Sequence, residues 1–413
     1  MSRVAFLLNN DFGFDARVKR EIDTLLANGV EVTLFCVCSA GGSLPAYEQN
    51  GRLTIRRLFK KPLKTFEPFT FRHLKGLTRI LLASQGRFDV VHAHDSNTLL
   101  LGWLLARLWR AKLVYDSHEL WGSVFAYERE IALKAFEAGA FSKKCLSRKL
   151  AGLKQSEHLE TWLLARCDAL ISVNDTLCRL LREKSSRKIP HVVSIRNIPH
   201  YFEMHTQPTR RFHEAFSLPE ETKILLYQGD IKTSRGVDLL LDAVARMSYP
   251  DFALILMGPI PEKEYARNLK QRLGALKQLG KAVFHQAQVP QKELLYWTAS
   301  ADLGLAPIIN VRESYYYCLP NKLFEYVQAG IPVATSDFPE MKNVIEAYGL
   351  GFTFNPEQPE VLAQALDNFL NDPQRGARYR QNVHQAKEAL TWDNEEKKLL
   401  VLYQILLNSM SDP

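Results

Sequence analysis

The sequence predicts an α/β fold of two doubly wound domains, each built on a parallel β-sheet. Two strand, turn and helix units indicate this fold. Residues 4–9 form a short apolar run before a helical pattern that ends near residue 27, and Asp15 is placed to cap that helix. Residues 224–228 form a second apolar run, followed by a helical pattern over residues 237–247. Such units repeat in doubly wound sheets, and 413 residues are enough for two cores.

The first domain is expected over residues 1–200 and the second over residues 201–390. Between residues 197 and 219 the hydrophobic periodicity is lost and Pro, His and Arg accumulate, which is typical of a linker. Residues 121–167 are helical in pattern and longer than a crossover between strands requires. This excursion is expected to shape a ligand site, to touch a membrane, or to be a simple surface insertion.

Polar residues end two buried strands of the first domain. Residues 89–95 end in Asp95, and residues 112–119 carry His118 near their end. Ligands of open parallel sheets bind beyond the carboxyl ends of the strands, where both side chains are expected to lie. Each is also consistent with a helix cap or with a polar group satisfied inside the fold. Gly13 follows the first strand, where a glycine lets a phosphate approach the backbone, although ordinary turns need glycines too.

A helix expected to begin at Pro320 organises the second domain. Proline suits the first turn of a helix, and Gly330 is placed to end this one. Leu323 and Phe324 share an inward face with Val327. Residues 331–334 then indicate a buried strand.

Polar residues gather at the amino end of this helix. Asn321 and Lys322 lie where free N–H groups and the positive pole of the helix dipole suit a diphosphate, and Lys322 is expected to add a full charge. Glu325, one turn further on, can accept hydrogen bonds from two neighbouring hydroxyls such as those of a ribose. A well-capped surface helix with one charged side would look the same.

The motif Pro-Asn-Lys-Leu-Phe-Glu-Tyr from residue 320, followed by Ala-Gly-Ile-Pro-Val-Ala, resembles the donor-binding segment of retaining glycosyltransferases of family 4. The likeness continues in residues 15–21 and 29–32 and in the tail from Trp392. It implies the GT-B fold, in which two Rossmann-like domains face an interdomain cleft. It also implies that residues 391–413 form a last helix that crosses back and packs on the first domain.

The resemblance implies that a sugar moves from a nucleoside-diphosphate sugar, UDP- or GDP-linked, to an acceptor hydroxyl with retention of configuration. His118 matches a histidine that hydrogen-bonds the transferred sugar, and Asp95 aligns with a polar residue near the acceptor pocket. These two residues are the candidate catalytic pair. Residues 286–290 resemble the loop around the nucleotide base. The candidate donor-binding residues are Gly13, Lys232, Arg235, Val289, Asn321, Lys322, Leu323 and Glu325.

The turn at residues 229–236 departs from the family's pattern. The family carries an arginine after the first glycine and a lysine before the second, and both clamp the diphosphate. Asp230 replaces the arginine and cannot bind phosphate, whereas Arg235 replaces the lysine and still can. Lys232 or Lys322 is therefore expected to supply the missing cation.

Tyr317 is a second departure. The family often has two glutamates separated by seven residues, and Glu325 matches only the second of them. Sequences with this motif often lack the first glutamate. Contacts to the sugar hydroxyls are then expected from elsewhere, such as Asn321 or Glu313.

Neither a metal nor another cofactor is expected, because the sequence has no DxD motif and no metal-ligand spacing. The departing diphosphate would instead be stabilised by the helix start and nearby cations. The cysteines form no CxxC pair, which favours free cytosolic thiols. No signal peptide precedes the first strand, and the apolar run over residues 99–109 is too short to span a bilayer. A cytoplasmic location is expected.

Positive charge concentrates in the first domain. Residues 1–200 hold 31 Lys and Arg against 19 Asp and Glu, and the remainder holds 22 against 26. Residues 52–79 mix phenylalanines with basic residues that include Lys60, Lys61 and Lys64. This composition suits the inner face of an anionic membrane, and with it a lipid-linked saccharide as acceptor. No nucleic-acid-binding motif accompanies the patch, so nucleic acid is not an expected partner, and a solvated basic loop is the alternative.

Two other functions on the same fold stay open. An epimerase or phosphorylase would bind a similar donor, but would need further clustered carboxylates or a cofactor lysine. A non-catalytic subunit that binds nucleotide or membrane is favoured by Asp230 and Tyr317.

Overall fold

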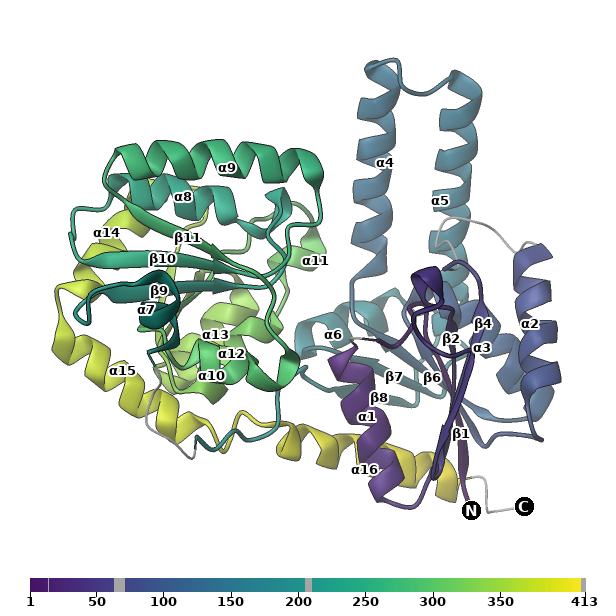
Figure 1. The fold of residues 1–413 in the computed structure, drawn as a ribbon. Coiled ribbons are helices and arrows are strands. Elements are labelled where there is room, and N and C mark those ends of the chain that lie inside the picture. Colours follow the sequence, from purple (N-terminus) through teal and green to yellow (C-terminus); the bar gives the residue numbers. More distant parts are fainter. Residues whose placement is uncertain (14, 63–70, 205–209, 410–413) are drawn as a thin grey trace. The chain divides into compact units, whose positions relative to one another are not determined.

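The computed structural model describes residues 1–13, 15–62, 71–204 and 210–409, which form two compact units. The first unit comprises residues 1–196 and the chain from Glu395 on, and the second comprises Asn197–Asn394 (Figure 1). From the sequence, the first domain was expected to end at residue 200 and the helix that returns to it was expected to begin at residue 391. In the described part of the chain, none of the helices combines the length and apolar character that a bilayer crossing demands.

The sheet of the first unit has the order β3-β4-β2-β1-β5-β6-β7-β8. Its neighbouring strands are parallel, except that β3 runs antiparallel to β4. The order reverses between β1 and β5, which makes this pair the topological switch point, where ligands of such sheets bind. The strands are β1 (Arg3–Leu7), β2 (Glu31–Val37), β3 (Tyr47–Asn50), β4 (Leu53–Phe59), β5 (Val90–His94), β6 (Lys112–Ser117), β7 (Ala169–Ser172) and β8 (His191–Ser194).

Helices connect these strands. As predicted, Asp15 caps α1, because its carboxylate accepts a hydrogen bond from the Val18 amide. The predicted helical excursion is α4 and α5, two long helices that pack side by side and extend beyond the sheet of this unit (Figure 1). The helices are α1 (Ala16–Ala27), α2 (Phe71–Ala83), α3 (Ser96–Trp109), α4 (Trp121–Glu137), α5 (Lys143–Leu164) and α6 (Asp175–Lys184), with a 3₁₀ turn η1 (Ala40–Gly42).

Two parts of the basic segment at residues 52–79 are regular structure, because β4 covers Leu53–Phe59 and α2 begins at Phe71. The solvated-loop alternative therefore does not hold for these two parts, and residues 63–70 lie outside the described residues. Alternate residues of β4 face inward, so Phe59 is buried and Arg57 is only 4% exposed. The Arg57 guanidinium is satisfied by the Glu48 carboxylate and by backbone carbonyls. Lys60 and Lys61 are exposed just past the strand, and Lys64 lies outside the described residues.

The second unit has the sheet order β11-β10-β9-β12-β13-β14, with all neighbours parallel, and its switch point lies between β9 and β12. Leu225 and Leu226 of β9 belong to separate apolar clusters, as expected for a parallel sheet covered on both faces. The strands are β9 (Lys223–Gln228), β10 (Phe252–Met257), β11 (Ala282–Gln286), β12 (Leu303–Ala306), β13 (Val333–Ser336) and β14 (Gly351–Phe354).

Helix α7 lies within the segment expected to be a linker, and its Phe212 is fully buried in the core of the second unit. The final helix, α16, begins at Trp392 in the second unit, and from Glu395 on it belongs to the first. The helices are α7 (Arg211–Phe216), α8 (Val237–Arg246), α9 (Lys263–Gln278), α10 (Leu294–Thr298), α11 (Glu313–Tyr316), α12 (Asn321–Ala329), α13 (Pro339–Tyr348), α14 (Pro359–Leu370), α15 (Pro373–Ala386) and α16 (Trp392–Asn408), with 3₁₀ turns η2 (Thr233–Arg235) and η3 (Gln291–Glu293).

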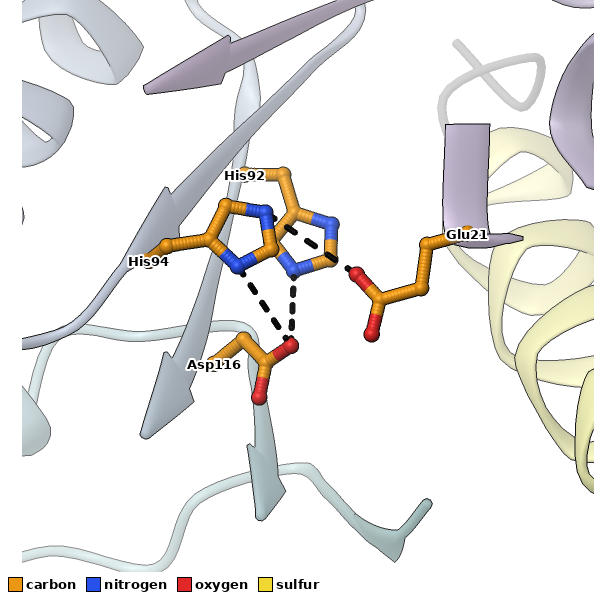
Figure 2. Close-up of side chains that lie close together, drawn as sticks. All are labelled: Glu21, His92, His94 and Asp116. Atoms are coloured by element: carbon orange, nitrogen blue, oxygen red, sulfur yellow. Dashed lines mark ion pairs between the residues drawn. The ribbon is translucent and has the colours of Figure 1, made fainter. Parts of the chain in front are cut away.

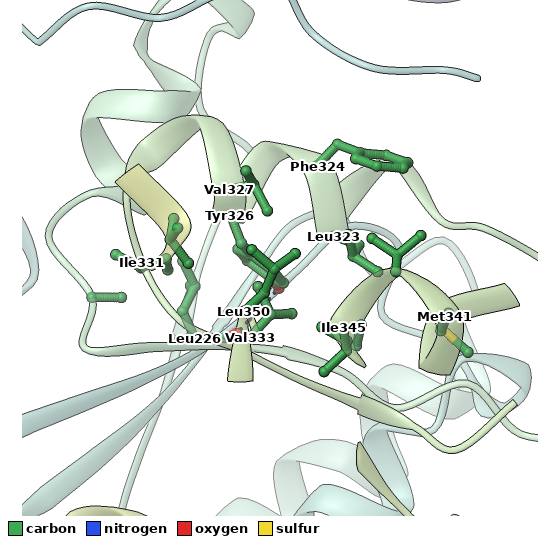
Figure 3. Close-up of a cluster of buried hydrophobic side chains, with 14 of the residues drawn as sticks. Leu226, Leu323, Phe324, Tyr326, Val327, Ile331, Val333, Met341, Ile345 and Leu350 are labelled. Carbon is green, nitrogen blue, oxygen red and sulfur yellow. Dashed lines mark hydrogen bonds between the residues drawn. The ribbon is translucent and has the colours of Figure 1, made fainter. Parts of the chain in front are cut away.

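Helix α12 begins one residue later than predicted. Pro320 is its N-cap, with an extended ψ of 140°, rather than part of the first turn. Gly330 ends the helix in the left-handed region, at a φ of 81°, as predicted. Leu323, Phe324 and Val327 are fully buried in the core, also as predicted (Figure 3). The following strand is β13, which starts at Val333 rather than at residue 331.

Tyr326 of α12 ties the two central strands together. Its hydroxyl accepts a hydrogen bond from the Gln228 amide at 3.1 Å and lies 3.0 Å from the Leu305 carbonyl oxygen. The ring passes so close to β12 that a Cβ on Gly304 would lie 2.3 Å from it. A glycine is therefore required at this position to let the ring reach the switch point.

We predict that Tyr326→Phe lowers the free energy of unfolding by about 1–3 kcal/mol, because the buried Gln228 amide and Leu305 carbonyl lose a partner while the ring still fills the core. Chemical denaturation measures the effect. Tyr348→Phe is the matched control, since the Tyr348 hydroxyl makes no hydrogen bond to the described residues. Equal stability of the two variants would contradict the bridging role.

Candidate functional site

Asp95 and His118 meet at the carboxyl ends of β5 and β6. The Asp95 carboxylate accepts hydrogen bonds from the His118 amide at 3.0 Å and from the Trp121 indole at 3.1 Å. Its other oxygen lies 3.4 Å from His118 Nδ1. Asp95 is the residue before α3, but its side chain makes no capping bond, so the helix-cap alternative does not hold. Its φ of 63° is strained for a residue with a side chain, as is often found at functional sites.

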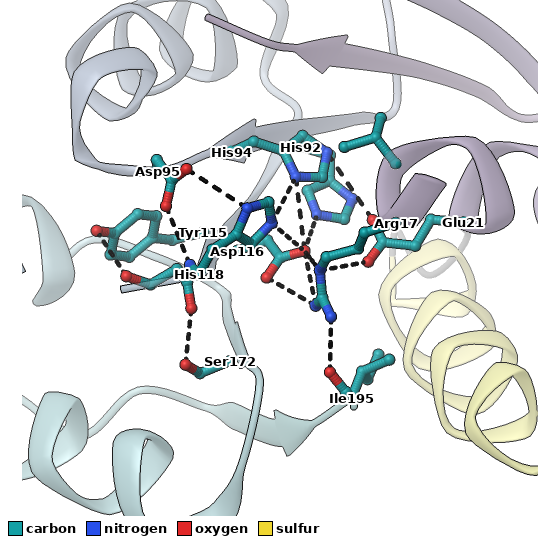
Figure 4. Close-up of polar contacts among 12 residues, drawn as sticks. Arg17, Glu21, His92, His94, Asp95, Tyr115, Asp116, His118, Ser172 and Ile195 are labelled. Atoms are coloured by element: carbon teal, nitrogen blue, oxygen red, sulfur yellow. Dashed lines mark hydrogen bonds and ion pairs between the residues drawn. The ribbon is translucent and has the colours of Figure 1, made fainter. Parts of the chain in front are cut away.

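Asp116, the residue before the end of β6, is the buried centre of a wider polar network (Figure 4). Arg17 of α1 donates to both oxygens of its carboxylate at 3.0 Å. Another guanidinium nitrogen of Arg17 donates to the Ile195 carbonyl at 2.7 Å. His118 Nε2 lies 3.5 Å from the Asp116 carboxylate, so the histidine ring stands between two carboxylates.

This network decides the charge on His118. Burial opposes protonation of the imidazole, but Asp95 and Asp116 outweigh it and raise the pKa of His118 to about 9. The pKa of Asp116 is held well below its usual range, because Arg17 and His118 outweigh the effect of burial. Near neutral pH His118 is therefore a cation with two N–H donors. About a fifth of its side chain is exposed, so a ligand can reach it.

Four side chains of this unit have the ligand types of a metal site: Glu21, His92, His94 and Asp116 (Figure 2). His94 lies 3.5 Å from the Asp116 carboxylate and 3.9 Å from that of Glu21. Arg17 binds Asp116 through its Nε and Nη2 nitrogens and lies 3.1 Å from Glu21, so a dication would have to displace a permanent cation. The donor set therefore does not fit a resident metal.

The sequence spacing does not reveal this cluster because its members come from three elements. One feature of the sequence could have indicated the cluster. His92 and His94 are two residues apart on β5, so their side chains lie on the same face of the sheet. Their rings stack, with centroids 4.4 Å apart. Burial lowers the pKa of both, and Tyr403 of α16 hydrogen-bonds His92 Nδ1 at 2.7 Å.

Gly13 lies after β1, on the same edge of the sheet. Its amide donates to the Asp11 carboxylate at 3.0 Å, and the Phe12 amide donates to the Asn10 side chain. The loop's own side chains therefore already hold the amides expected to meet a phosphate.

In the second unit, Lys322 is buried at the start of α12, with 9% exposure. Its ammonium lies 3.7 Å from the centroid of the Tyr227 ring and makes no hydrogen bond to the described residues. Burial, and then the charge of Arg235, lower the pKa of Lys322 to about 7. The expected full charge is therefore only partly present at neutral pH, and an anion bound there would restore it.

The cations of the η2 turn are unequal. Lys232 lies 3.4 Å from the carboxylate of Asp230, so its charge is partly neutralised. Arg235 lies over the Tyr315 ring at 5.2 Å and is half-buried. Of the two lysines expected to replace the missing cation, Lys322 is the one that pairs with no carboxylate in the described part of the chain.

Glu325 is oriented from the end of β9. The Gln228 side-chain nitrogen donates to its carboxylate, and the side-chain oxygen Oε1 of Gln228 accepts a hydrogen bond from the Thr298 hydroxyl at 2.8 Å. This arrangement leaves Glu325 half-buried near Lys322, whose pKa it raises.

The remaining predicted donor residues differ in what they offer. Leu323 is fully buried in the core, so its side chain cannot touch a ligand. Val289 packs partly against the same core, in the loop after β11. Asn321 is exposed in the first turn of α12, and Glu313 is exposed in the first turn of α11. The Tyr317 ring packs edge-on against the neighbouring Tyr316.

Comparisons with known proteins cover nearly the whole chain. Residues 12–212 match the glycosyl transferase 4-like domain, and residues 208–386 match the glycosyl transferases of group 1. A D-inositol 3-phosphate glycosyltransferase of Thermobispora bispora is 22% identical over 388 residues, 91% of this chain and 85% of that protein.

Solved structures show the same fold at low sequence identity. Sucrose-phosphate synthase from Thermosynechococcus elongatus aligns with a TM-score of 0.75 at 19% identity, covering 99% of this chain and 100% of that one. HepE of Anabaena, solved with UDP and glucose, aligns with a TM-score of 0.72 at 14% identity, covering 98% and 100%. The expected GT-B fold of two Rossmann-like domains is thereby confirmed.

We predict that the free energy of unfolding falls less with rising pH in Glu21→Gln than in the parent protein. Burial raises the pKa of Glu21 to about 8, so the folded state favours its neutral form. This contribution to stability is complete below pH 4.5 and is lost as the pH rises through 8. The variant should gain roughly 3–5 kcal/mol over the parent across that range. Denaturation at several pH values measures it, with the exposed Glu137→Gln as control. Parallel pH profiles of parent and Glu21→Gln would refute the assignment.

Proposed function

Because the two matched domains indicate a glycosyltransferase of the GT-B, family 4 type, we propose that this chain transfers a sugar from a nucleoside-diphosphate sugar to an acceptor hydroxyl. The observation that carries the proposal is Lys322 at the amino end of α12, whose buried side-chain nitrogen makes no hydrogen bond to the residues that the structure describes. We further propose the subgroup marked by the Pro-Asn-Lys-Leu-Phe-Glu-Tyr motif, and retention of configuration at the sugar. A UDP-linked donor is supported by the likeness to HepE, which was solved with UDP and glucose.

The donor diphosphate would lie at the start of α12. Lys322 and Arg235 supply its positive partners, and the first amides of the helix add the positive end of the helix dipole. Bound phosphate raises the pKa of Lys322, so the ammonium is fully charged when the leaving group develops negative charge. This arrangement needs no metal, and metal independence is part of the proposal. Glu325, held by Gln228, accepts hydrogen bonds from the ribose hydroxyls.

His118 would bind the transferred sugar. As an imidazolium it can donate a hydrogen bond to a sugar hydroxyl, while Asp95 and Asp116 keep it protonated. Asp95 would receive the acceptor hydroxyl, a role supported by the partial exposure of its side chain at the same strand ends. Burial raises the pKa of Asp95, which makes its carboxylate a better proton acceptor.

A non-catalytic nucleotide-binding subunit is the second candidate. The pairing of Lys232 with Asp230 favours it, because it weakens one side of the proposed clamp. Such a subunit would bind UDP or GDP without turning over any nucleotide sugar.

The proposal predicts release of free nucleoside diphosphate from one member of a panel of UDP-, GDP- and ADP-sugars, at a rate that EDTA leaves unchanged. Glu325→Ala should raise the donor KM at least about tenfold, and His118→Ala should lower kcat about 100-fold or more. Glu346→Ala, exposed on α13, is the control. Binding of a nucleotide without release of nucleoside diphosphate from any donor would favour the non-catalytic subunit. Unchanged KM and kcat in a variant would show that the mutated residue is not part of the site.

We also predict that UDP binding at pH 8 takes up close to one proton per site. Lys322, with its pKa near 7, is mostly neutral there and becomes charged beside the diphosphate. Calorimetry in buffers of different ionisation enthalpy measures the uptake. In Lys322→Gln the uptake should disappear, and equal uptake by the variant would assign the proton to another group.

We propose that the acceptor is lipid-linked and that the first unit lies on an anionic membrane surface, on the cytoplasmic side. Lys60 and Lys61 are exposed beside each other after β4. Replacing both by Glu should reduce co-sedimentation with phosphatidylglycerol vesicles several-fold, since each cation near such a surface contributes about 1 kcal/mol. Lys263→Glu with Lys270→Glu, exposed on α9, is the charge-matched control. Equal loss in both variants would contradict this surface.

A further inference from the structure

The first unit contains a basic cavity at the amino edge of its sheet, away from the candidate site. The cavity has a volume of about 870 Å³. Its walls come from the ends of α3 and α5 and from the chain before β6, β7 and β8. The basic and aromatic lining residues are Trp103, Arg107, Arg110, Lys112, Trp162, Arg166 and Arg187.

The cavity carries a large excess of positive charge. Its lining includes five cations, and its sole carboxylate is Asp168, which lies 3.5 Å from the ammonium of Lys112. Asp168 also accepts a hydrogen bond from the Leu113 amide at 2.8 Å, so its carboxylate is shared between the backbone of β6 and the ammonium of Lys112. One carboxylate therefore offsets only one of the five cations.

Ordinary structural roles account for only part of this charge. Arg166 lies over the Trp162 ring at 3.4 Å and donates a hydrogen bond to the Trp162 carbonyl at 2.7 Å. Its guanidinium therefore caps a carbonyl at the end of α5. The guanidinium groups of Arg107, Arg110 and Arg187 pair with no carboxylate in the described part of the chain. Three like charges around one hollow repel one another unless an anion joins them.

The indoles give the cavity a rigid wall. The rings of Trp103 and Trp162 pack edge-on with centroids 5.0 Å apart. Beside this wall, planar guanidinium groups can bind phosphate oxygens bidentately. Because several cations line one cavity, the combination favours an anion with several negative charges, such as one that carries two or more phosphates, over a single halide ion.

The cavity is separate from the site at the strand ends. Lys112 opens β6, whereas Ser117 closes it next to His118. At about 3.3 Å per residue, the two ends of this strand lie roughly 16 Å apart. A ligand in the cavity would therefore not occupy the proposed donor or acceptor position.

We propose that this cavity is a second binding site, for an anion that carries two or more phosphate groups. Arg107, Arg110 and Arg187 bind the phosphates, with Lys112 and Arg166 completing the positive lining. The proposal does not depend on the transferase activity. The phosphates can belong to a soluble polyphosphate or to a lipid headgroup, since both present the same oxygens.

The test uses the full chain with two probes in about 0.15 M salt, where long-range attraction is screened. Inorganic triphosphate, measured by calorimetry, represents the soluble source, and sedimentation with cardiolipin vesicles represents the lipid source. The variant Arg107→Gln, Arg110→Gln, Arg187→Gln should weaken binding at least about tenfold. All three side chains are exposed, and thermal unfolding checks that the fold is kept. Asp168→Asn should instead strengthen binding several-fold, because it removes the opposing carboxylate.

The control is Arg267→Gln, Lys270→Gln, Lys277→Gln on α9, which removes the same charge from exposed positions. Binding of triphosphate that only the cavity variant loses supports a soluble ligand. Binding of vesicles alone, again lost only in the cavity variant, supports a lipid headgroup. Absence of binding to both probes, or equal losses in the control, would overturn the site.

Discussion

The ion pair between Arg17 and Asp116 is the interaction on which the polar end of the first unit depends. Asp116 is fully buried, and a buried carboxylate left without its cation would destabilise the fold by about 3–5 kcal/mol. With Arg17 in place, Asp116 stays ionised and keeps His118 protonated. The same pair occupies the centre of a cluster that would otherwise suit a metal. One salt bridge thus favours a hydrogen-bonding site over a metal centre.

The residues of the motif at α12 divide between those that pack in the core and the polar residues near the amino end of the helix. Leu323 fills the core, and Tyr326 spans β9 and β12 where the order of the sheet reverses. In the first two turns of the same helix, Lys322 and Glu325 lie at the end of β9, where Lys322 is over the Tyr227 ring and Glu325 accepts a hydrogen bond from the Gln228 side chain. Because the helix is locked to both central strands, its amino end is held rigidly. The side chain of Lys322 is held at this end with a pKa of about 7, so near neutral pH roughly half of its ammonium groups carry a charge.

The first unit separates its two kinds of polar site along the strands. At the carboxyl ends, charges of both signs are balanced within hydrogen-bonding distance. At the amino ends, Arg107, Arg110 and Arg187 line a cavity, and none of these three pairs with a carboxylate in the described part of the chain. The excess of basic residues in the first half of the sequence is therefore not confined to the segment of Lys60 and Lys61. Part of it gathers around a hollow large enough for a polyphosphate.

The sequence alone determined the α/β class, the order of most strands and helices, and the position of α12 with its glycine stop, because these follow from local periodicity and capping. It also placed Asp95 and His118 at strand ends. Only the tertiary structure brought His92 and His94 to Glu21, turned residues 53–59 into a strand with Arg57 inside, and gathered arginines from α3 and from the loop before β8. The lowered pKa of Lys322 was equally hidden, since burial depends on what packs around a side chain and not on its neighbours in the chain.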